Sequence, residues 1–468
     1  MIINQIAQGG SGSQTKYGAS GDTFLGDIDA NGVLQNATTA TDLTFTGVTG
    51  IAAVTPTMGV LFRRFQNLQS IRKVSFPALA SITTPSAMSY CFYGTSITEL
   101  DLSNLTTING EAALTYVCYN SPNLASLKIG KLASVFGKQA LYYAFSGCSS
   151  LTGALDLTWV TPSTVSGIQV MSHAFEGTGI TSVDFSGWTG EMNSPSQGFQ
   201  AMFKDCKSLT SADLSNITRV SNATVGSMFS GCSALVNVDV HNFEKSYAAM
   251  AEMFSGCSAL TSIDLNKLEI VSDSNGFSNV FQGCTSLVDV GLKNLKTIQG
   301  NQCANNAFKG CTALETLKLP SLDTLTNGSL LMRGFCSGCT SLKNMYFYAL
   351  KPASFNNTNV FDNMLLGVTG CTVHFPMSVQ STIGSWTSVT GGFDGTNTIV
   401  LFDIVQTLTG ADTNSYVRSE KDSTSTANAW LYNSTLYYTS GTTEPQVGDT
   451  IYSDSACTTA VTTISAIA

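Results

Sequence analysis

The sequence predicts a solenoid of short parallel strands, followed by a small antiparallel β domain. Three observations carry this prediction. One sequence unit recurs with starts 25 to 30 residues apart over most of the chain, and a cysteine returns at the same position in many of these units. Near the C-terminus, aromatic and β-branched residues alternate between short turn signals, which is the pattern of antiparallel strands. We expect about 12 coils in the repeat region.

The composition limits the classes of partner. Of 468 residues, 43% are hydrophobic and only 11% are charged, whereas about a quarter are charged in typical soluble domains. Lysine and arginine together number 22 and aspartate and glutamate 31, so the net charge is −9. A negative chain gives nucleic acid no electrostatic reason to bind, and we expect no nucleic-acid partner.

The first residues, MIINQIAQGGSGSQTKYG, contain no basic flank, apolar core or cleavage site of a secretory signal. The sequence also lacks a run of about 18 uninterrupted apolar residues. We therefore expect a chain that is made in a cytosol, keeps its thiols reduced and inserts no segment into a membrane.

The repeated unit can be written F-x-G-C-x-x-L-x-x-I-x-L. It is intact or nearly so from Phe203, Phe229, Phe254, Phe281 and Phe308. It occurs with one-residue slips or substitutions from Phe65, Phe92, Cys118, Phe145, Phe175 and Cys336. The spacing falls in the period range of leucine-rich solenoids, in which one unit cannot bury its own apolar face and stacks on the next. We expect the Phe, Leu and Ile of each unit to form one continuous core.

The recurring cysteines are predicted to be structural. In a stacked solenoid such positions lie about 4.7–4.9 Å apart, where a thiol acts as a small buried hydrophobic group. Leu68 and Ser121 occupy the same slot in other units, and neither can form a disulfide or a zinc site. We therefore expect a ladder of reduced thiols with no metal. Its members stand three residues after the aromatic position: Cys148, Cys206, Cys232, Cys257, Cys284, Cys311 and Cys339.

Units such as AFKGCTALETLKLPSLDTL and MFSGCSALTSIDLNKLEIV resemble the BspA-type leucine-rich repeats of bacterial surface proteins, over residues 40–376. The resemblance implies short parallel strands on a concave sheet, formed by TSIDL-like pieces, and a convex side of turns and short helices. DLTFTGVTGI, with Leu43 and Phe45 in strand slots, is the expected N-terminal cap. CTVHFPMSVQSTIGSW, with Val373 and Phe375 in those slots, is the expected C-terminal cap.

Two flanks lie outside the repeats. Residues 1–39 are rich in glycine and resemble leader segments of phage and prophage tail proteins from gut bacteria. Residues 377–401 are interpreted as a linker or cap extension. Residues 402–468, which include VGDTIYSD, are predicted to form a small β domain similar to C-terminal modules of phage tail fibre and adhesin proteins. This resemblance implies a virion tail protein that is made in the host cytoplasm, contacts other tail proteins through its N-terminus and forms a homotrimer.

The sequence carries no motif of an enzyme. The three histidines, His173, His241 and His374, lie in unrelated units, and no zinc-protease, nucleophile-elbow or phosphate-loop motif occurs. We expect neither catalysis nor a cofactor. A glycan hydrolase is disfavoured because no pair of acids stands out in one place.

The segment DIDANG has the first half of a calcium-binding loop. Asp27, Asp29 and Asn31 place oxygen ligands at alternate positions, and Gly32 permits a sharp turn. The twelfth position is Thr38, where such a loop needs a bidentate Glu. A plain polar turn is therefore the default interpretation, and a calcium site is the alternative.

An acidic column is the main candidate for a binding site. The residue between the two aliphatic positions of each strand is expected to face away from the core. Asp is depleted in strands, and like charges at one strand spacing repel each other. The column either keeps the sheet solvated and monomeric, or was inherited with the repeat, or forms a groove for a sugar, a peptide or a cation, with Tyr346 as a stacking platform. It comprises Asp101, Asp156, Asp184, Asp213, Asp239 and Asp264.

Two functions follow from these expectations. The first is a non-enzymatic phage tail fibre or tail-tip adhesin, attached to the virion by its N-terminus. It would bind a host cell-surface glycan or protein through the repeats or the C-terminal domain, where Trp430, Tyr432, Tyr437 and Tyr438 are the candidate residues. The second is a bacterial cell-surface or secreted interaction protein.

Overall fold

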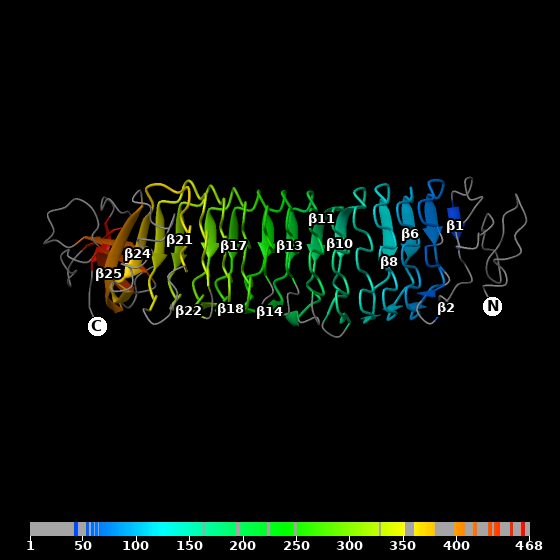
Figure 1. Ribbon diagram of the computed structural model, residues 1–468, viewed down its shortest axis with the longest axis horizontal. Coiled ribbons are helices and arrows are strands. Elements are labelled where there is room, and N and C mark those ends of the chain that lie inside the picture. Colours follow the sequence, from blue (N-terminus) through cyan, green and yellow to red (C-terminus); the bar gives the residue numbers. More distant parts are fainter. Residues whose placement is uncertain are drawn as a thin grey trace, which may run out of the picture.

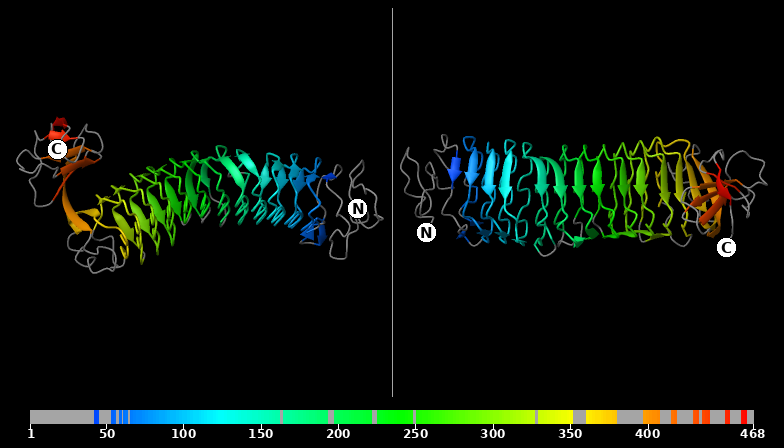
Figure 2. Two further views of the ribbon diagram at one scale, coloured as in Figure 1. Left: turned by 90° about the horizontal axis from the view of Figure 1, so that it is seen from above. Right: turned by 180° about the vertical axis from the view of Figure 1, so that it is seen from behind.

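The computed structural model describes residues 61–379, apart from position 64 and the stretches 162–163, 193–196, 222–224, 248–249, 327–328 and 352–359, and it describes residues 397–399. Outside these ranges it gives only the backbone pairing of short strands. The calcium candidates Asp27, Asp29 and Asn31 lie outside the described residues. The described coils stack into an elongated, gently curved rod along which the chain advances from one end to the other (Figure 1 and Figure 2).

One side of the rod, which we call the strand face, receives one short strand from each coil. Neighbouring strands pair in parallel, in four successive sheets along the rod. Between β4 and β24 the chain makes about 11 turns, close to the 12 coils expected from the sequence. The strands of this face are β1 (Asp42–Thr44), β4 (Lys73–Ser75), β6 (Glu99–Leu102), β8 (Ser126–Ile129), β10 (Thr152–Asp156), β11 (Gly179–Asp184), β13 (Ser211–Asp213), β15 (Asn237–Asp239), β17 (Ser262–Asp264), β19 (Asp289–Gly291), β21 (Thr316–Leu319), β23 (Asn344–Phe347) and β24 (Thr372–Pro376).

Alternate residues of each strand face the core, as the two-residue period of a β-strand predicts. In β6, Leu100 and Leu102 are buried, while Glu99 and Asp101, which alternate with them, are partly exposed. At the two ends the expected caps continue this register. Leu43 pairs with Val74 in the first sheet, and Val373 is buried in β24. Phe45 lies outside the described residues.

A second column of parallel strands runs along another side of the rod, the second face. The predicted repeat fold is confirmed, but this side carries strands where short helices were expected. Most of its strands contain a buried aliphatic residue, such as Val271 or Ile298, whose branched side chain favours an extended backbone. The strands are β5 (Ser81–Ile82), β7 (Thr107–Ile108), β9 (Ser134–Val135), β12 (Gly190–Met192), β14 (Ile217–Ser221), β16 (Lys245–Tyr247), β18 (Ile270–Ser272), β20 (Thr297–Gln299) and β22 (Thr324–Thr326).

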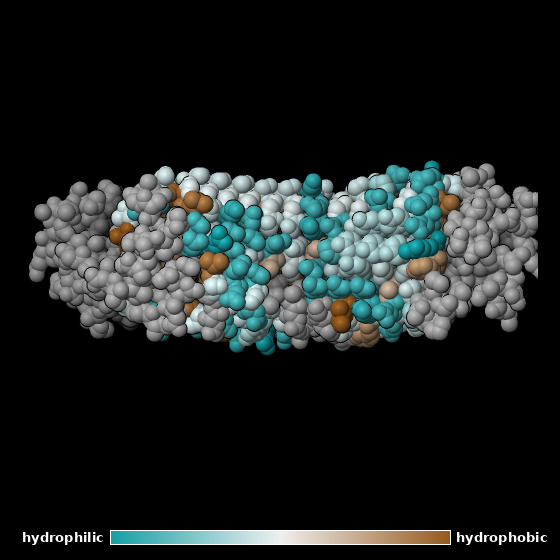
Figure 3. All heavy atoms as spheres, viewed as in Figure 1, coloured by the Kyte–Doolittle hydropathy of each residue, from teal (hydrophilic) through white to brown (hydrophobic). Residues whose placement is uncertain are grey.

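Helix is almost absent from the described part of the chain, where it amounts to the 3-10 turn η3 (Met377–Val379). Among the described residues, no helix has the length and apolar character that a membrane-spanning helix needs. On the surface seen in Figure 3, hydrophilic side chains predominate and hydrophobic ones are scattered.

The third side, the turn side, is a ribbon of consecutive turns that the sequence analysis did not predict. Alternate N–H groups donate to the next coil; Gly256 N, for example, donates to Gln282 O at 2.7 Å. The N–H groups between them donate three residues back, as from Ser255 N to Glu252 O at 3.0 Å. Every fourth residue takes a left-handed backbone, with φ of 58° at Glu252 and 76° at Gly256. Backbone hydrogen bonds therefore join the coils on this side as well.

The glycine of the repeated unit is explained by this left-handed backbone and not by crowding. Gly310 has a φ of 74°, and a Cβ added there would lie 3.8 Å from Gly283 Cα, which is an ordinary contact. In other coils the same slot holds Asn120 or Asp205, with φ of 54° and 57°. Asn and Asp are the residues other than glycine that tolerate this conformation best.

The core is a stack of phenylalanine rings that runs along the rod. Successive ring centroids lie 5.3 to 5.9 Å apart with nearly parallel planes. All of these rings are buried, so each coil covers the aromatic face of the one before it. The rings are those of Phe145, Phe175, Phe203, Phe229, Phe254, Phe281 and Phe308.

The cysteine slot supplies a hydrogen-bond donor to this core. All seven ladder cysteines are buried free thiols. Six of them donate to the carbonyl of the phenylalanine one coil earlier, at 3.0 to 3.2 Å. Cys148 donates to Cys118 O, in the aromatic position, at 3.1 Å, and the Ser121 hydroxyl donates in the same way to Phe92 O at 2.9 Å. The slot thus takes a small donor that satisfies a buried carbonyl.

The last strands of the strand face continue into the C-terminal sheet. Strand β25 (Thr398–Thr407) pairs in parallel with β24 over residues 398–402 and antiparallel with β28 over residues 402–407. The remaining pairs of this sheet are antiparallel, in the order β25-β28-β27-β26-β29-β30. Their bounds are β26 (Ser415–Arg418), β27 (Ala429–Tyr432), β28 (Thr435–Thr439), β29 (Thr450–Tyr452) and β30 (Ala460–Thr463), and a hairpin of β2 (Ala53–Thr55) and β3 (Met58–Gly59) lies near the N-terminus.

The ladder thiols other than Cys339 give the fold a pH-dependent stability, because their pKa values are raised. Burial raises the pKa of Cys206 to about 11 and the pKa values of Cys148 and Cys284 to about 12, from an ordinary value near 9. A pKa that is higher in the folded state contributes stability below the unfolded pKa, and that stability is lost as the pH rises through the folded pKa. We expect the free energy of unfolding in urea to stay level up to about pH 8.5 and to fall between about pH 9 and pH 11.

Alkylation measures the same property directly in a Cys457→Ala background, which removes a cysteine outside the described residues. At pH 8 iodoacetamide should label the remaining thiols in urea but not in native buffer, because the thiolate is the reacting species. In a Cys206→Ser/Cys284→Ser variant the hydroxyls keep the hydrogen bonds without titrating, so the alkaline loss of stability should be smaller. Rapid labelling of ladder cysteines in native buffer would contradict the structure.

Candidate functional site

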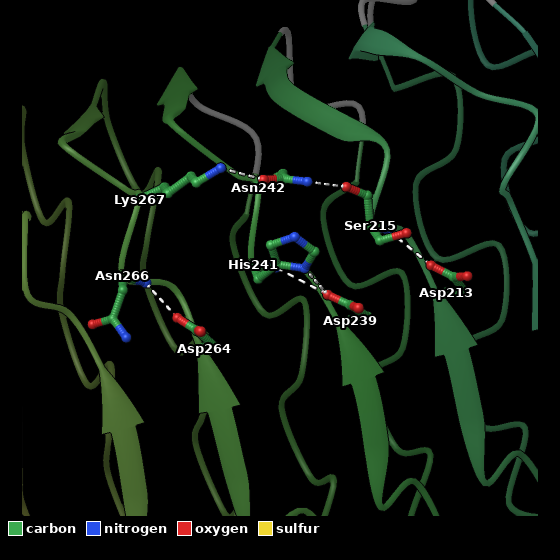
Figure 4. A network of polar contacts seen from close by, with 8 residues as sticks. All are labelled: Asp213, Ser215, Asp239, His241, Asn242, Asp264, Asn266 and Lys267. Carbon is green, nitrogen blue, oxygen red and sulfur yellow. Dashed lines mark hydrogen bonds and ion pairs between the residues drawn. The ribbon is translucent and has the colours of Figure 1, made fainter.

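Five of the six predicted aspartates lie side by side on consecutive strands of the strand face. The parallel register makes the first four direct neighbours, and the fifth takes the same place on the following strand, β17. Figure 4 shows the last three at the ends of their strands, pointing to the same side. We call this set the acidic row: Asp156, Asp184, Asp213, Asp239 and Asp264.

The sixth aspartate, Asp101, is separated from the row. Its partner on the next strand is Lys128, whose Nζ lies 3.8 Å from Asp101 Oδ2 and 2.7 Å from Glu99 Oε1. Partial burial alone would raise the pKa of Asp101, but hydrogen bonds from Ser103 and the charge of Lys128 outweigh it, so the pKa lies below its usual value. Asp101 thus belongs to a local ion-pair cluster.

The middle of the acidic row borders an open hollow of about 650 Å³ on the strand face. We call this hollow the acidic groove. Its walls combine short apolar side chains with hydroxyl, amide and carboxylate groups, which suits a polar ligand better than an apolar one. It is lined by Val183, Ser211, Ala212, Asp213, Val236, Asn237, Val238, Asp239, His241, Ser262, Ile263 and Asp264.

Each aspartate of the column also closes the turn that follows its strand. Its Oδ1 accepts a hydrogen bond from the backbone N–H two residues further on, at 2.7 to 3.2 Å in all six cases. This arrangement is an Asx turn, a preferred conformation of Asp and Asn. The sequence analysis missed it, although the signal was present: each Asp precedes a chain reversal, in the triplets DLS, DLT, DFS, DVH or DLN. The recurrence of a polar residue therefore has a structural cause.

Thr158 shows how such a turn acts on the carboxyl group. Its hydroxyl and its N–H donate to Asp156 Oδ1 at 2.7 and 2.9 Å. These hydrogen bonds favour the ionised form and lower the pKa of Asp156. Each turn uses one carboxylate oxygen and leaves the other for a ligand.

A polar network borders the groove at the strand ends (Figure 4). Lys267 Nζ donates to Asn242 Oδ1 at 2.5 Å, and Asn242 Nδ2 donates to Ser215 O at 2.6 Å. His241 Nδ1 contacts Asp239 Oδ1, and its side chain is 43% exposed. These groups come from neighbouring coils, so sequence reasoning, which treated His241 alone, had no signal for their meeting.

Tyr346 stands in the same column but outside the groove. Gly291 and Lys318 occupy the coils between it and the acidic row. Its ring stacks on His374 at 4.2 Å and on Tyr348 at 5.4 Å between centroids. Burial lowers the pKa of His374 to about 4, so this imidazole is neutral at pH 7. The structure thus gives Tyr346 aromatic neighbours and does not bring it to the acids.

The C-terminal candidates lie on two paired strands. Trp430 and Tyr432 belong to β27, Tyr437 and Tyr438 to β28, and Trp430 is the register partner of Tyr437. Their side chains lie outside the described part of the chain. Within the described part, no group of three or more His, Cys, Asp or Glu residues is placed to hold a metal ion.

The Asx turns can be tested at Asp264, which accepts the N–H of Asn266 at 2.8 Å. Asp264→Ala removes the acceptor and should lower the free energy of unfolding by about 0.5–2 kcal/mol, the range for loss of a comparable side-chain cap. Asp264→Asn keeps an acceptor oxygen and should stay close to the parent. Asp289→Ala, at an exposed acid of the next strand, is the matched control. Equal urea midpoints for the Ala and Asn variants at position 264 would rule the turn out as a source of stability.

Comparison with solved structures finds other repeat proteins. A leucine-rich repeat protein from Bacteroides ovatus matches at 17% identity and a TM-score of 0.41, covering 82% of this chain and 89% of that one. The pneumococcal vaccine antigen PcpA matches at 14% identity and a TM-score of 0.35, over 84% of this chain and 99% of that one. An internalin from Listeria monocytogenes matches at 13% identity and a TM-score of 0.24, over 77% and 82%.

No curated protein sequence matches the chain at a significant level. The BspA type leucine-rich repeat region, in contrast, matches in overlapping segments over residues 62–151, 112–244, 199–330 and 251–369. These segments cover the coils that carry the phenylalanine stack, the cysteine ladder and the acidic row. No catalytic family is indicated by the match. The chain therefore belongs to the BspA-type leucine-rich repeat family.

Proposed function

We propose that the protein is a non-enzymatic adhesin that binds a cell-surface ligand, a glycan or a protein, along the acidic groove. The observation that carries this proposal is the acidic row, five aspartates at the same place on consecutive strands beside an open hollow. Carboxylates accept strong hydrogen bonds from hydroxyl, amine and guanidinium groups. A ligand chain lying along the rod would meet one acceptor at each coil.

The Asx turn explains a polar residue at these positions but not its charge. Asn closes such a turn as well as Asp does, and it would avoid the repulsion between carboxylates that stand one strand spacing apart. Within the described residues, the ion pair to the row comes from His241, which is charged only when protonated. Aspartate in five successive coils therefore favours a ligand that brings positive charge or hydrogen-bond donors.

We further propose that this adhesin is carried on a phage tail. The support is the likeness of residues 1–39 to tail-protein leaders and of residues 402–468 to tail-fibre C-terminal modules. In this proposal the N-terminus contacts other tail proteins, the working form is a homotrimer and the C-terminal domain shares in host binding. The alternative is a bacterial cell-surface or secreted interaction protein, which the likeness of the repeats to those of bacterial surface proteins favours.

The groove is tested by Asp213→Asn/Asp239→Asn/Asp264→Asn. The amide oxygens keep the turns, so the melting temperature should stay within a few degrees of the parent, while attachment to host cells should fall at least about tenfold, as expected when several charge-assisted hydrogen bonds are lost. Parent attachment should also weaken with added salt, because the groove is open to solvent. Flow cytometry with labelled protein measures both effects.

The matched control removes the same number of charges from other sides of the coils that carry Asp239 and Asp264, with Glu244→Gln/Glu252→Gln/Glu269→Gln. This variant should attach like the parent. If the triple Asn variant also attaches like the parent, recognition does not lie in the groove, and the C-terminal strands that carry Trp430 and Tyr437 become the next candidates.

The carrier is tested by mass spectrometry of density-purified phage particles and of washed cell envelopes from the same lysed culture. A tail protein should co-purify with particles at a fixed ratio to other tail proteins. Enrichment in cell envelopes, with none in particles, would refute the tail proposal and support the bacterial surface protein.

A further inference from the structure

Seven aromatic side chains gather on the turn side of the first coils, away from the acidic groove. All of them are partly exposed. They come from four consecutive coils, and each contacts at least one other ring of the set. We call this surface the tyrosine face: Tyr90, Tyr93, Tyr116, Tyr119, Tyr142, Tyr143 and His173.

Four of these rings form a stacked row along the rod. Tyr90 and Tyr116 lie 4.8 Å apart, Tyr116 and Tyr143 5.1 Å, and Tyr143 and His173 4.2 Å between centroids. The planes of neighbouring rings differ by 3° to 16°. Because the faces of stacked rings cover one another, the exposed part of this row consists of ring edges and hydroxyl groups.

Other rings of the set broaden the row into a surface. Tyr93 and Tyr119 stack at 5.3 Å as a second, shorter row. The plane of Tyr142 stands at 86° to that of Tyr143, with centroids 4.6 Å apart. Both faces of the Tyr143 ring are taken by its neighbours in the stack, so Tyr142 meets its edge and lies across the row.

The backbone at the stacked row argues against a purely structural origin. Tyr90, Tyr116, Tyr143 and His173 have φ between 51° and 57°, a left-handed conformation that is unfavourable for bulky residues. In the next three coils the same position holds Ala201, Ser227 and Glu252, and in the last four it holds residues that suit it, which are Asn279, Asn306, Gly334 and Asn363. Stacking between the rings compensates for the unfavourable backbone conformation, whereas asparagine at these positions would need no such compensation.

The chemistry of the face is polar but uncharged. Burial raises the pKa of Tyr116 to about 12, so its hydroxyl stays protonated and can both donate and accept. Beside the rings runs a row of carboxamides, in which Gln139 Nε2 donates to Gln169 Oε1 at 2.8 Å.

The charges at the margins of the face are occupied within the protein. The guanidinium of Arg63 lies 4.8 Å from the centre of the Tyr90 ring. Glu176 is 2.7 Å from His173 Nδ1 and 3.9 Å from Lys204 Nζ. Among the described residues at this margin, the carboxylate of Glu176 is therefore already paired, and the cation of Arg63 packs on the rings that it borders.

We propose that the tyrosine face is a second binding surface, for an uncharged polysaccharide. Neutral sugars combine apolar C–H groups, which can contact the exposed ring edges, with hydroxyl groups, which bond to phenols and carboxamides. A face of rings, hydroxyls and amides, whose marginal carboxylate Glu176 is already paired, is complementary to such a chain. Its position on the turn side leaves the acidic groove open, so this proposal goes beyond the groove and does not depend on it.

The test is affinity electrophoresis of the full-length protein through native gels that contain one soluble neutral polysaccharide each: α-glucan, β-glucan, mannan, xylan or galactan. We expect at least one of them to retard the parent. Tyr116→Asn/Tyr143→Asn should weaken that retardation at least about tenfold, because it removes the centre of the row. The replacement keeps the fold, since asparagine occupies this position in later coils, and a melting curve checks it.

The matched control is Asn279→Ser/Asn306→Ser, in the same left-handed column away from the tyrosines, and it should be retarded like the parent. The groove variant Asp213→Asn/Asp239→Asn/Asp264→Asn should also be retarded normally, which separates failure of the groove from failure of the tyrosine face. A parent that runs freely in every gel would overturn the proposal, as would a double Asn variant retarded as strongly as the parent. Loss of a protein partner in that variant, without polysaccharide binding by the parent, would instead make the face a protein interface.

Discussion

Each coil of this protein depends on the next one to satisfy its backbone. Alternate N–H groups of the turn side, the edges of the strands and the phenylalanine carbonyl that receives a thiol all find their partners one coil away. A buried backbone group without a partner is costly, so a single coil has no stable folded state and the stack must form as a whole. The glycine, cysteine and phenylalanine recur at fixed positions in the sequence because each coil must meet this requirement.

The same constraint turns every exposed side chain into a member of a column. Neighbours in a column sit about one strand spacing apart, so their interaction repeats along the rod. Carboxylates at that spacing repel, whereas aromatic rings attract, yet the acidic row and the tyrosine face have one property in common. At both positions the backbone alone would favour asparagine, either to close the Asx turn or to take the left-handed conformation. Both columns that are proposed as binding surfaces depart from this preference.

The repeat period, the core positions and the strand slots could be predicted because each depends on spacing within one unit. The second face could not, because its strands are two to five residues long, too short for an alternating pattern to stand out. The left-handed turn side was hidden for a different reason: Tyr116 or Glu252 in that conformation contradicts residue preference, and only contact with the next coil holds it. Lys267 and Asn242 come from neighbouring coils. Because the coils differ in length, their spacing in the sequence does not show that the two side chains meet. The Asx turns, in contrast, were visible in principle, since an acid before a chain reversal is their usual signature.

Strand β25 has a mechanical consequence for a protein that attaches to surfaces. Its first half is bonded to β24 of the rod and its second half to β28 of the C-terminal sheet. In the proposed adhesin, tension between the rod and a cell bound at that sheet would pass through this strand. The parallel pairing of β24 and β25 spans five residue pairs. A pull directed along the strands loads these hydrogen bonds together, in shear, whereas a pull across the strands opens them one after another. The junction is therefore strong in one direction and weak in the other, and the angle at which the rod meets a surface would decide how long the attachment lasts.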